Sequence, residues 1–290
     1  MSDKEGGKKM EKLFNIESVA LTHPGMLRQD NQDNCFADAI GEDGQVLAVV
    51  ADGVGGYAGG EEAARLAVTL LPQNLLQQGL DDAQSFRHAV ISTHNAIYRH
   101  RFTNPALTRM SCVWTALLLD PAAGSMHFSH LGDTRLYAFN FNGSRLLKLS
   151  HDHSYIGQLE EQGVLTETQA MTHPRRNVID RMAADFPLDD RSQYYQMATL
   201  PMAADITYLL CSDGLTDMIT SAEIIDILSS PATLQEKAQS LIDAANRAGG
   251  RDNVTVVLVA VNTIPDMSDQ LPSSATDVMN RYAHYIRESP

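Results

Sequence analysis

The sequence predicts an α+β fold in which antiparallel strands and amphipathic helices share a large core. Three observations support this prediction. Continuous apolar runs at 46–51, 206–211 and 254–261 are typical of strands that are buried on both faces. Between residues 112 and 141, three shorter apolar segments separated by turn residues indicate an antiparallel meander. Apolar residues recur at helical spacing between 61 and 99, which predicts two helices that cover one sheet face.

The N-terminal part of the chain is expected to contain a tail, two strands and these two helices. Residues 1–12 are polar and contain glycine, so we expect them to be disordered and the folded domain to begin near Leu13. The first helix should end near Pro72 or soon after it. The expected elements are strands starting near 13 and 35 and helices at about 61–72 and 82–99.

The central part is expected to form the meander and then a flap. The second turn of the meander, LGDT at 131–134, is short enough for a tight hairpin, so that Asp133 would project from the end of a strand pair. Residues 142–204 lack long periodic segments, which favours a mobile flap or insertion. This region also holds three histidines whose spacing does not match a zinc site and which we expect on exposed turns: His151, His153 and His173.

The C-terminal part should complete the domain. Two amphipathic segments, 221–228 and 234–248, predict helices before the last buried strand. We expect one domain over residues 13–262, followed within 263–290 by a polar linker and a possible helix at 276–288.

Three aspartates stand at the ends of the buried runs. At Asp52 the first run passes into a glycine-rich turn, where backbone carbonyls can approach a ligand, and this suits a hard divalent cation. Capping of the following helix by Asp52 explains this stretch equally well. Asp213 follows the second run in the same way, and Asp252 precedes the third. If the third strand is antiparallel to the other two, the three carboxylates meet at one sheet edge.

Composition argues against several classes of protein. A net charge of -14 without a cluster of Lys and Arg argues against a nucleic-acid-binding protein. No segment approaches the length of a membrane helix, and the first residues do not resemble a secretory signal, so we expect a cytoplasmic protein without a membrane partner. The three cysteines lie in or beside apolar segments without CxxC spacing, and we interpret them as free thiols.

Converging carboxylates favour metal-dependent hydrolysis. Such a group is costly to keep ionised unless bound cations offset its charge. Oxygen ligands without Cys or paired His favour Mg²⁺ or Mn²⁺ over zinc, and two such ions roughly 4 Å apart can hold a bridging hydroxide as nucleophile. A phosphate monoester also requires a cation for its phosphoryl oxygens, and Arg28 offers a planar guanidinium. Without a phosphoryl substrate, Arg28 is an ordinary surface arginine.

Five short motifs occur in a fixed order across roughly residues 14–262: Arg28-x-x-Asn31-Gln32-Asp33, Val50-Ala51-Asp52-Gly53-x-Gly55-Gly56, Leu131-Gly132-Asp133-Thr134-Arg135, Leu210-Cys211-Ser212-Asp213-Gly214-Leu215 and Arg251-Asp252-Asn253-Val254-Thr255. Each alone is a weak signal. In this order they resemble the bacterial PPM, or PP2C-type, metal-dependent protein serine/threonine phosphatases. The resemblance implies a four-layer α-β-β-α sandwich of two antiparallel sheets flanked by helices, with a flap next to the active site at about 151–185.

The resemblance also implies a set of metal ligands for two Mn²⁺ or Mg²⁺ ions. Asp52 would bridge both ions, and the backbone carbonyl of Gly53 would be a further ligand. Asp213 and Asp252 would complete the ligands of the first ion. Asp33 would bind an ion or hold a water molecule beside it.

Two further roles follow from the same resemblance. Arg28 would bind the substrate phosphate, and Asp133 together with Asp213 would hold a third, weaker ion, as in bacterial members. Val54 is a departure, because animal enzymes carry a histidine there that is proposed as the general acid. A metal-bound water or another group must therefore protonate the leaving alkoxide in this chain.

The implied activity is the hydrolysis of phosphoserine and phosphothreonine in proteins by direct attack of the bridging water. The resemblance implies a monomeric enzyme that opposes a bacterial serine/threonine kinase and acts on its phosphorylated targets. An alternative is a regulatory pseudophosphatase that binds phosphoproteins, but Asp52, Asp213 and Asp252 are all present. A metal-dependent nuclease would fit the carboxylates but not the lack of a basic groove.

Overall fold

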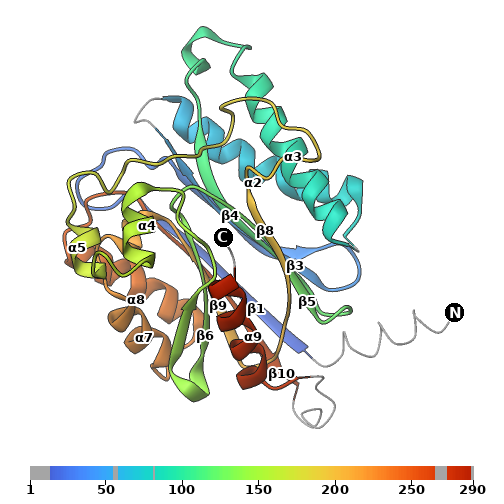
Figure 1. Ribbon diagram of the computed structural model, residues 1–290, viewed down its shortest axis with the longest axis vertical. Helices are drawn as coiled ribbons and strands as arrows, with labels where there is room; N and C mark the ends of the chain where they lie inside the picture. The colour runs from blue at the N-terminus through green and yellow to red at the C-terminus, as the bar shows by residue number, and fades with distance from the viewer. Residues whose placement is uncertain (1–13, 55–57, 81, 265–272, 289–290) are drawn as a thin grey trace, which may run out of the picture.

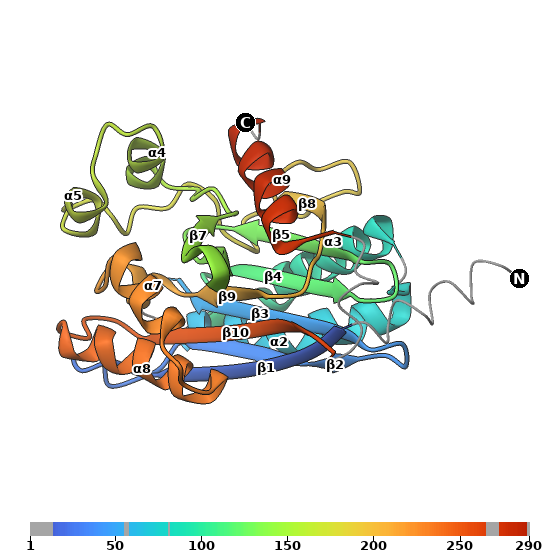
Figure 2. The same ribbon diagram turned by 90° about the horizontal axis from the view of Figure 1, so that it is seen from below.

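The protein folds into four layers, as the family resemblance implies. The computed structural model describes residues 14–54, 58–80, 82–264 and 273–288. Two five-stranded antiparallel sheets pack face to face, with helices on both outer faces (Figures 1 and 2). The predicted tail at 1–12 and most of the predicted linker lie outside the described residues.

The two sheets, A and B, have five strands each. In hydrogen-bonding order, sheet A contains β1 (Phe14–His23), β10 (Val254–Thr263), β9 (Ile206–Cys211), β6 (Arg135–Asn140) and β7 (Arg145–Lys148). In the same order, sheet B contains β2 (Asp33–Ile40), β3 (Gln45–Gly53), β4 (Cys112–Asp120), β5 (Ser125–Leu131) and β8 (Gln196–Pro201). The described helices are α2 (Ala58–Gln78), α3 (Ala83–His100), α4 (Tyr155–Glu161), α5 (Glu167–Met171), α6 (Asp213–Thr216), α7 (Ser221–Ser229), α8 (Leu234–Arg247) and α9 (Ala275–Glu288).

The apolar run of β3 serves two cores because side chains alternate between the two faces of a strand. Val46 and Val50 face the core between the sheets. Leu47 and Val49 face the core beneath α2 and α3. A third core separates sheet A from α7 and α8. Both faces of the central strands are therefore covered, which explains why their sequences are continuously apolar.

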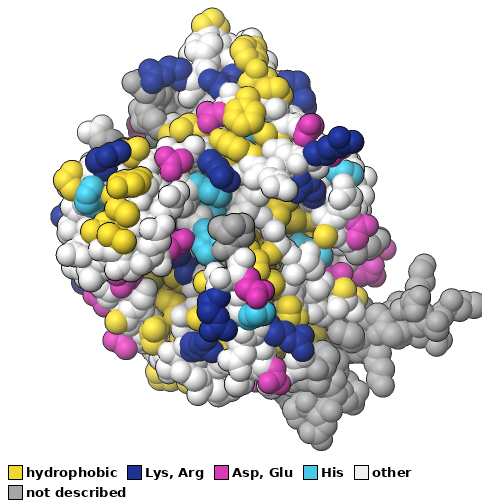
Figure 3. Space-filling view, viewed as in Figure 1, with side chains coloured by type: hydrophobic (Ala, Val, Ile, Leu, Met, Phe, Trp, Pro, Cys, Tyr) yellow, Lys and Arg dark blue, Asp and Glu magenta, His cyan; other side chains and the backbone are white. Residues whose placement is uncertain are grey.

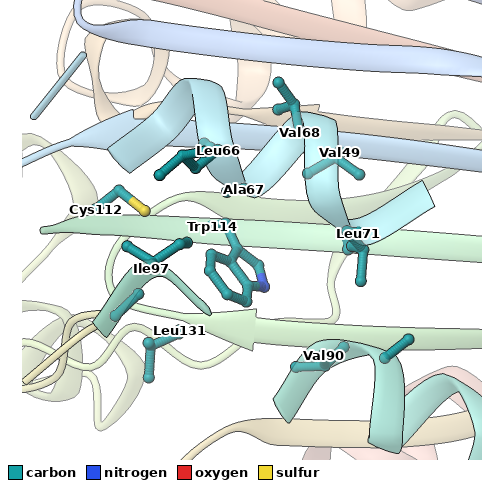
Figure 4. Close-up of a cluster of buried hydrophobic side chains, with 14 of the residues drawn as sticks. Val49, Leu66, Ala67, Val68, Leu71, Val90, Ile97, Cys112, Trp114 and Leu131 are labelled. Carbon is teal, nitrogen blue, oxygen red and sulfur yellow. The ribbon is translucent and has the colours of Figure 1, made fainter. Parts of the chain in front are cut away.

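Helices α2 and α3 cover the outer face of sheet B, as predicted. Figure 4 shows their side chains around Trp114 of β4, which is fully buried. Helix α2 does not end near Pro72 but continues to Gln78. The prediction of its end was wrong because Leu71 and Leu75, on either side of the proline, are both buried in the core. Their packing outweighs the one intrahelical hydrogen bond that proline cannot donate.

The predicted hairpin at 131–134 is a crossing between the two sheets. β5 pairs with β4 and β8 in sheet B, whereas β6 pairs with β9 and β7 in sheet A. Gly132 has a φ of 100°, and a Cβ atom there would lie 2.1 Å from Val113 Cγ1. A hairpin and a crossing require similar turn residues, and the local sequence does not distinguish them. Asp133 therefore lies where the chain passes from one sheet to the other.

Helix α9 confirms the possible helix predicted near 276–288. It packs against β6 and β7, beside the edge of the sandwich (Figures 1 and 2). Val278, Met279 and Tyr282 are buried in the core between the sheets. Among the helices that the structure describes, α9 included, none combines the length and apolar character needed to cross a bilayer.

Candidate active site

Carboxylates from both sheets meet at one end of the sandwich. Asp213 follows β9 and Asp252 precedes β10, and these two strands are antiparallel neighbours in sheet A. Asp52 lies on β3 in sheet B, so the prediction that the three share one sheet edge was wrong. The structure nevertheless brings them together, because all three line a pocket of about 130 Å³ that Asp133 also lines. The carboxylates converge because the two sheets stack face to face, and not because their strands share one sheet edge.

The backbone of the pocket is held by hydrogen bonds between distant loops. Asn253 accepts the N–H of Gln32 at 2.9 Å and donates to the carbonyl oxygens of Pro24 and Asp30. The N–H of Gly53 donates to the Gln32 carbonyl at 3.2 Å. Gly53 cannot carry a side chain, because a Cβ atom would lie 2.4 Å from the carbonyl carbon of Gly60. The loop before β2 and the end of β3 are thus locked together beside the carboxylates.

Asp33 supports the pocket from behind. It pairs with Asp52 in the register of β2 and β3. Its Oδ2 accepts hydrogen bonds from Ser212 Oγ at 2.7 Å and from Thr255 Oγ1 at 2.6 Å. Burial raises the pKa of Asp33 to about 7, although these two hydrogen bonds oppose the shift. Sequence reasoning assigned no role to Ser212 and Thr255, although both stand inside the motifs that carry Asp213 and Asp252.

Four aspartates in or directly behind the pocket have raised pKa values, and we call them the pocket carboxylates: Asp33, Asp52, Asp133 and Asp213. Burial, followed by mutual repulsion, raises the pKa of Asp52 and of Asp133 well above the usual range. Burial and the nearby Asp252 raise the pKa of Asp213 to about 6, against the opposing charge of nearby arginines. The protein alone therefore does not fully compensate these negative charges.

The donor set fits hard cations that are only partly enclosed by protein. All side-chain donors of the pocket carboxylates are oxygens, which Mg²⁺ and Mn²⁺ prefer. In the described part of the chain, no three His, Cys, Asp or Glu side chains are grouped closely enough to hold a metal ion by themselves. Backbone carbonyls and water would have to complete the coordination, and Mg²⁺ usually keeps several waters in proteins.

Arg28 lies at the mouth of this pocket, where the sequence predicts it. Its guanidinium Nη2 lies 2.8 Å from Asp252 Oδ2. The Arg28 side chain is 47% exposed and that of Asp252 is 23% exposed, so the pair is open to solvent. An exposed pair of this kind contributes little to stability, and either partner can exchange it for another ligand.

The flap lies beside the pocket. Helices α4 and α5 stand at one end of the molecule, outside the four layers (Figures 1 and 2). Asn177 and Ile179, from the segment after α5, line the same pocket as Asp52. The sequence placed both in the flap but did not single them out as site residues. Arg176 forms an ion pair with Asp217, which follows α6. The flap therefore contributes to the wall of the pocket.

A second group of buried charges lies on the other side of Asp133, and we call it the Arg135 cluster. Arg135 Nη2 lies 2.7 Å from Asp152 Oδ2 and 2.8 Å from Glu160 Oε2. Burial would raise the pKa of Asp152, but Arg135 and Lys148 outweigh it and hold this pKa below its usual range. The cluster consists of Arg135, Lys148, Asp152, Glu160 and Glu161.

His153 is not on an exposed turn, contrary to the prediction. Its ring stacks on that of the buried His130 with centroids 5.1 Å apart. Its Nδ1 accepts the N–H of Gly132 at 3.0 Å, and its own N–H donates to the Gly132 carbonyl at 2.7 Å. Burial lowers the pKa of His153 to about 4, so the ring is neutral at pH 7 and Nδ1 is free to accept. His153 thus fixes the turn that presents Asp133.

Comparison with known sequences places the chain among phosphatases. The sequence model of the protein phosphatase 2C family matches residues 26–249. The serine/threonine phosphatase stp of Listeria welshimeri is 32% identical over 248 residues, which cover 83% of this chain and 94% of that protein. Protein phosphatase PhpP of Streptococcus pneumoniae is 31% identical over 258 residues, which cover 85% of this chain and 98% of that protein.

Comparison with solved structures gives the same result. The S. agalactiae serine/threonine phosphatase superimposes with a TM-score of 0.73 at 28% identity, covering 85% of this chain and 99% of that one. The catalytic domain of the protein phosphatase PstP, solved in complex with two manganese ions, superimposes with a TM-score of 0.72 at 29% identity. That alignment covers 86% of this chain and 99% of the PstP domain.

Proposed function

Because the chain belongs to the protein phosphatase 2C, or PPM, family of protein serine/threonine phosphatases, we propose that its pocket carboxylates hold two Mn²⁺ or Mg²⁺ ions for the hydrolysis of phosphoserine and phosphothreonine. The observation that carries this proposal is the group of aspartates whose pKa values are raised around one pocket. When bound, the ions would supply an activated water as the nucleophile for the phosphate ester. No phosphoenzyme is required.

Each pocket residue has a proposed role toward these ions. Asp52 would contact both ions, because it stands at the centre of the group. Asp213, Asp252 and the backbone carbonyl of Gly53 would complete the first coordination shell. Asp33 would orient a coordinating water through Oδ1, since its Oδ2 already accepts two hydroxyl hydrogen bonds.

Arg28 would exchange partners when a substrate binds. In this structure its guanidinium pairs with Asp252. A phosphate group would replace Asp252 on Arg28, and a cation would replace Arg28 on Asp252. Both exchanges conserve charge pairing, and a guanidinium can hold two phosphoryl oxygens at once.

Asp133 would hold a third, weaker ion together with Asp213. Both line the pocket, and Asp133 comes from the sheet crossing rather than from the strand end that carries Asp52. Val54 also lines the pocket and cannot donate a proton to the leaving alkoxide. Protonation of the leaving group would therefore depend on the Asp133 side of the site.

The test is the variant Asp133→Ala. It should retain tight binding of two Mn²⁺ ions, because the ligands around Asp52 remain. Its kcat should fall most on phosphoserine peptides, whose alkoxide leaving group needs a proton, and less on para-nitrophenyl phosphate, whose phenolate does not. The measurement is kcat on both substrates over a Mn²⁺ titration, with calorimetry to count the ions.

Asp43→Ala is the matched control, since Asp43 is an exposed aspartate in the turn at the far end of β3. It should leave kcat on both substrates unchanged. Equal losses on the two substrates in Asp133→Ala would contradict the role in leaving-group protonation. Unchanged activity in Asp133→Ala would show that Asp133 only forms part of the turn.

The proposed substrates are phosphorylated proteins, including a bacterial serine/threonine kinase and its targets, and the proposed working form is a monomer. On the face that carries the flap and α9, basic side chains are interspersed with acidic ones and form no continuous stripe (Figure 3). This favours protein substrates over nucleic acid.

Unchanged phosphothreonine on the kinase after incubation with the enzyme would contradict the kinase assignment. Light scattering would test whether the enzyme is a monomer. The alternative, a phosphoprotein-binding pseudophosphatase, predicts binding without turnover in saturating Mn²⁺.

A further inference from the structure

Helix α9 lies beyond the part of the chain that the family model matches, which ends at residue 249. It is nevertheless built into the sandwich. Tyr282 is fully buried, with its Oη 2.7 Å from Tyr208 Oη and 2.6 Å from the carbonyl oxygen of Pro201. The inner face of α9 is therefore anchored by packing and by hydrogen bonds to strands of both sheets.

A second tyrosine of α9 is linked through Gln196 to the segment that leads into the flap. Tyr285 Oη accepts a hydrogen bond from Gln196 Nε2 at 2.9 Å, and its ring meets that of Phe128 edge-on with centroids 6.0 Å apart. Gln196 Nε2 also donates to the Leu149 carbonyl at 3.1 Å, and Gln196 Oε1 accepts the N–H of His151 at 2.8 Å. Gln196 thus holds both ends of the short segment 149–151, and Tyr285 holds Gln196.

The same segment leads to Asp133. Two residues after His151, His153 makes two hydrogen bonds to Gly132, one through its N–H and one through its ring. Gly132 is the residue before Asp133. A path of hydrogen bonds and short backbone steps therefore runs from α9 through Gln196 to the turn that presents a pocket carboxylate.

We propose that Tyr285 is a positioning residue for Asp133, acting through Gln196, His151 and His153. The consequence for a weakly held ion at Asp133 rests on the function proposed above, whereas the consequence for the backbone does not. In this way α9 would limit local opening of the backbone at the sheet crossing and at the start of the flap.

The Tyr285 hydroxyl matters because Gln196 must use both ends of its amide group. Without that hydroxyl, one N–H of Gln196 loses its partner and the amide can rotate away from Leu149 and His151. A single neutral hydrogen bond of this kind changes a local opening equilibrium by about five-fold. The variant Tyr285→Phe keeps the ring and its contact with Phe128 and removes the hydrogen bond to Gln196.

The test is hydrogen exchange of the full chain in the presence of chelator, which reports on the backbone without bound metal. Tyr285→Phe should speed exchange of the amides of His151, His153 and Gly132 by about five-fold. Gln196→Met, which removes all three hydrogen bonds of that side chain, should speed it further. Tyr282→Phe is the matched control, because it removes a hydroxyl from the same helix that has no bond to Gln196.

The second measurement is the Mn²⁺ concentration that gives half-maximal kcat on a phosphoserine peptide. Tyr285→Phe should raise it several-fold, with KM for the peptide unchanged and with less effect on para-nitrophenyl phosphate. Unchanged exchange in both Tyr285→Phe and Gln196→Met would overturn the proposal. An equal increase in the exchange rates of these amides in Tyr282→Phe would also overturn it, because looser packing of α9 as a whole would then explain the effect without a specific role for Tyr285.

The two measurements separate this inference from the proposed function. If Asp133→Ala itself leaves the Mn²⁺ dependence unchanged, the proposed third ion is wrong, and the exchange data still decide whether Tyr285 positions the backbone. If Asp133→Ala shifts the Mn²⁺ dependence and Tyr285→Phe speeds exchange without shifting it, the coupling from α9 to Asp133 is wrong.

Discussion

The pocket carboxylates include Asp133, and the Arg135 cluster lies beside that residue; both groups withdraw several acidic side chains from water. In the pocket, burial and repulsion raise the pKa values of Asp52 and Asp133. In the Arg135 cluster, the pKa of the buried Asp152 is lowered, because Arg135 and Lys148 lie against it. Burial acts in the same direction in both places, and the difference is whether the chain supplies its own cations.

This difference separates a structural charge group from a functional one. A buried acid that is paired with Arg and Lys stabilises one conformation but has no remaining capacity for an external ion. A group of buried acids without enough such partners is costly to the folded protein and is relieved by cations from solution. Substitutions in the two groups should therefore change stability in opposite directions.

The largest effect is expected for Asp52→Asn, which removes one charge and one oxygen ligand from the centre of the pocket. We expect kcat to fall by roughly 1,000-fold or more and calorimetry to show weaker Mn²⁺ binding. In chelator the same variant should be more stable than the wild type, because a buried repelling charge is gone. Unchanged Mn²⁺ affinity would exclude Asp52 as a central ligand.

Asp152→Asn should lower the stability of the protein, in contrast to Asp52→Asn. It leaves Arg135 buried without its nearest partner, and the free energy of unfolding should fall by about 3 kcal/mol. Urea unfolding should show the same loss with chelator and with Mn²⁺, since this cluster does not depend on external ions. Glu62→Gln is the control, because the Glu62–Arg65 pair is exposed and its loss should cost less than about 1 kcal/mol. A smaller loss for Asp152→Asn than for the control would refute the comparison.

Arg28→Ala should mainly raise KM for phosphopeptides, by about ten-fold, with a smaller change in kcat. The reason is that a guanidinium contact of equal strength in the ground state and the transition state contributes to binding alone. Arg28→Lys should give an intermediate KM, since an ammonium keeps the charge but not the planar fork. Wild-type kinetics for Arg28→Ala would show that Arg28 does not touch the substrate.

The last of these predictions concerns pH. The pKa of Asp33 is raised to about 7 and that of Asp213 to about 6, so in chelator the folded protein binds more protons than the unfolded chain between about pH 4 and 7. Its stability should therefore fall as pH rises through this window, by about 1.4 kcal/mol for each unit by which a pKa is raised. Thermal unfolding in chelator tests this, and saturating Mn²⁺ should remove the trend. Asp152, with its lowered pKa, should contribute no change above pH 5.

Sequence reasoning predicted most elements whose signal is periodic. The strands β3, β9 and β10 were found because they are continuously apolar, and α3 and α8 because their apolar residues repeat at helical spacing. The strands β7 and β8 were missed, since β7 has only four residues and β8 has a mixed pattern at the edge of sheet B.

The sequence could not show which segments pair or pack with one another. The turn at Gly132 was recognised, but its crossing from one sheet to the other depends on which strand pairs with β6, and that strand, β9, lies far along the chain. In the pocket, the motifs identified the acidic residues themselves. The hydroxyls of Ser212 and Thr255 gained a role only when three segments met around Asp33.

The pairing of β1 with β10 has a consequence for the order of folding. β1 stands at the edge of sheet A, and its hydrogen-bonded neighbour in the described chain is formed more than two hundred residues later in the sequence. Sheet B, in contrast, is built from β2, β3, β4 and β5 paired in chain order. Because distant pairings cost more chain entropy before they stabilise anything, we expect sheet B to form first. Pulsed hydrogen exchange during refolding should find β3 amides protected before those of β1, and simultaneous protection would contradict this order.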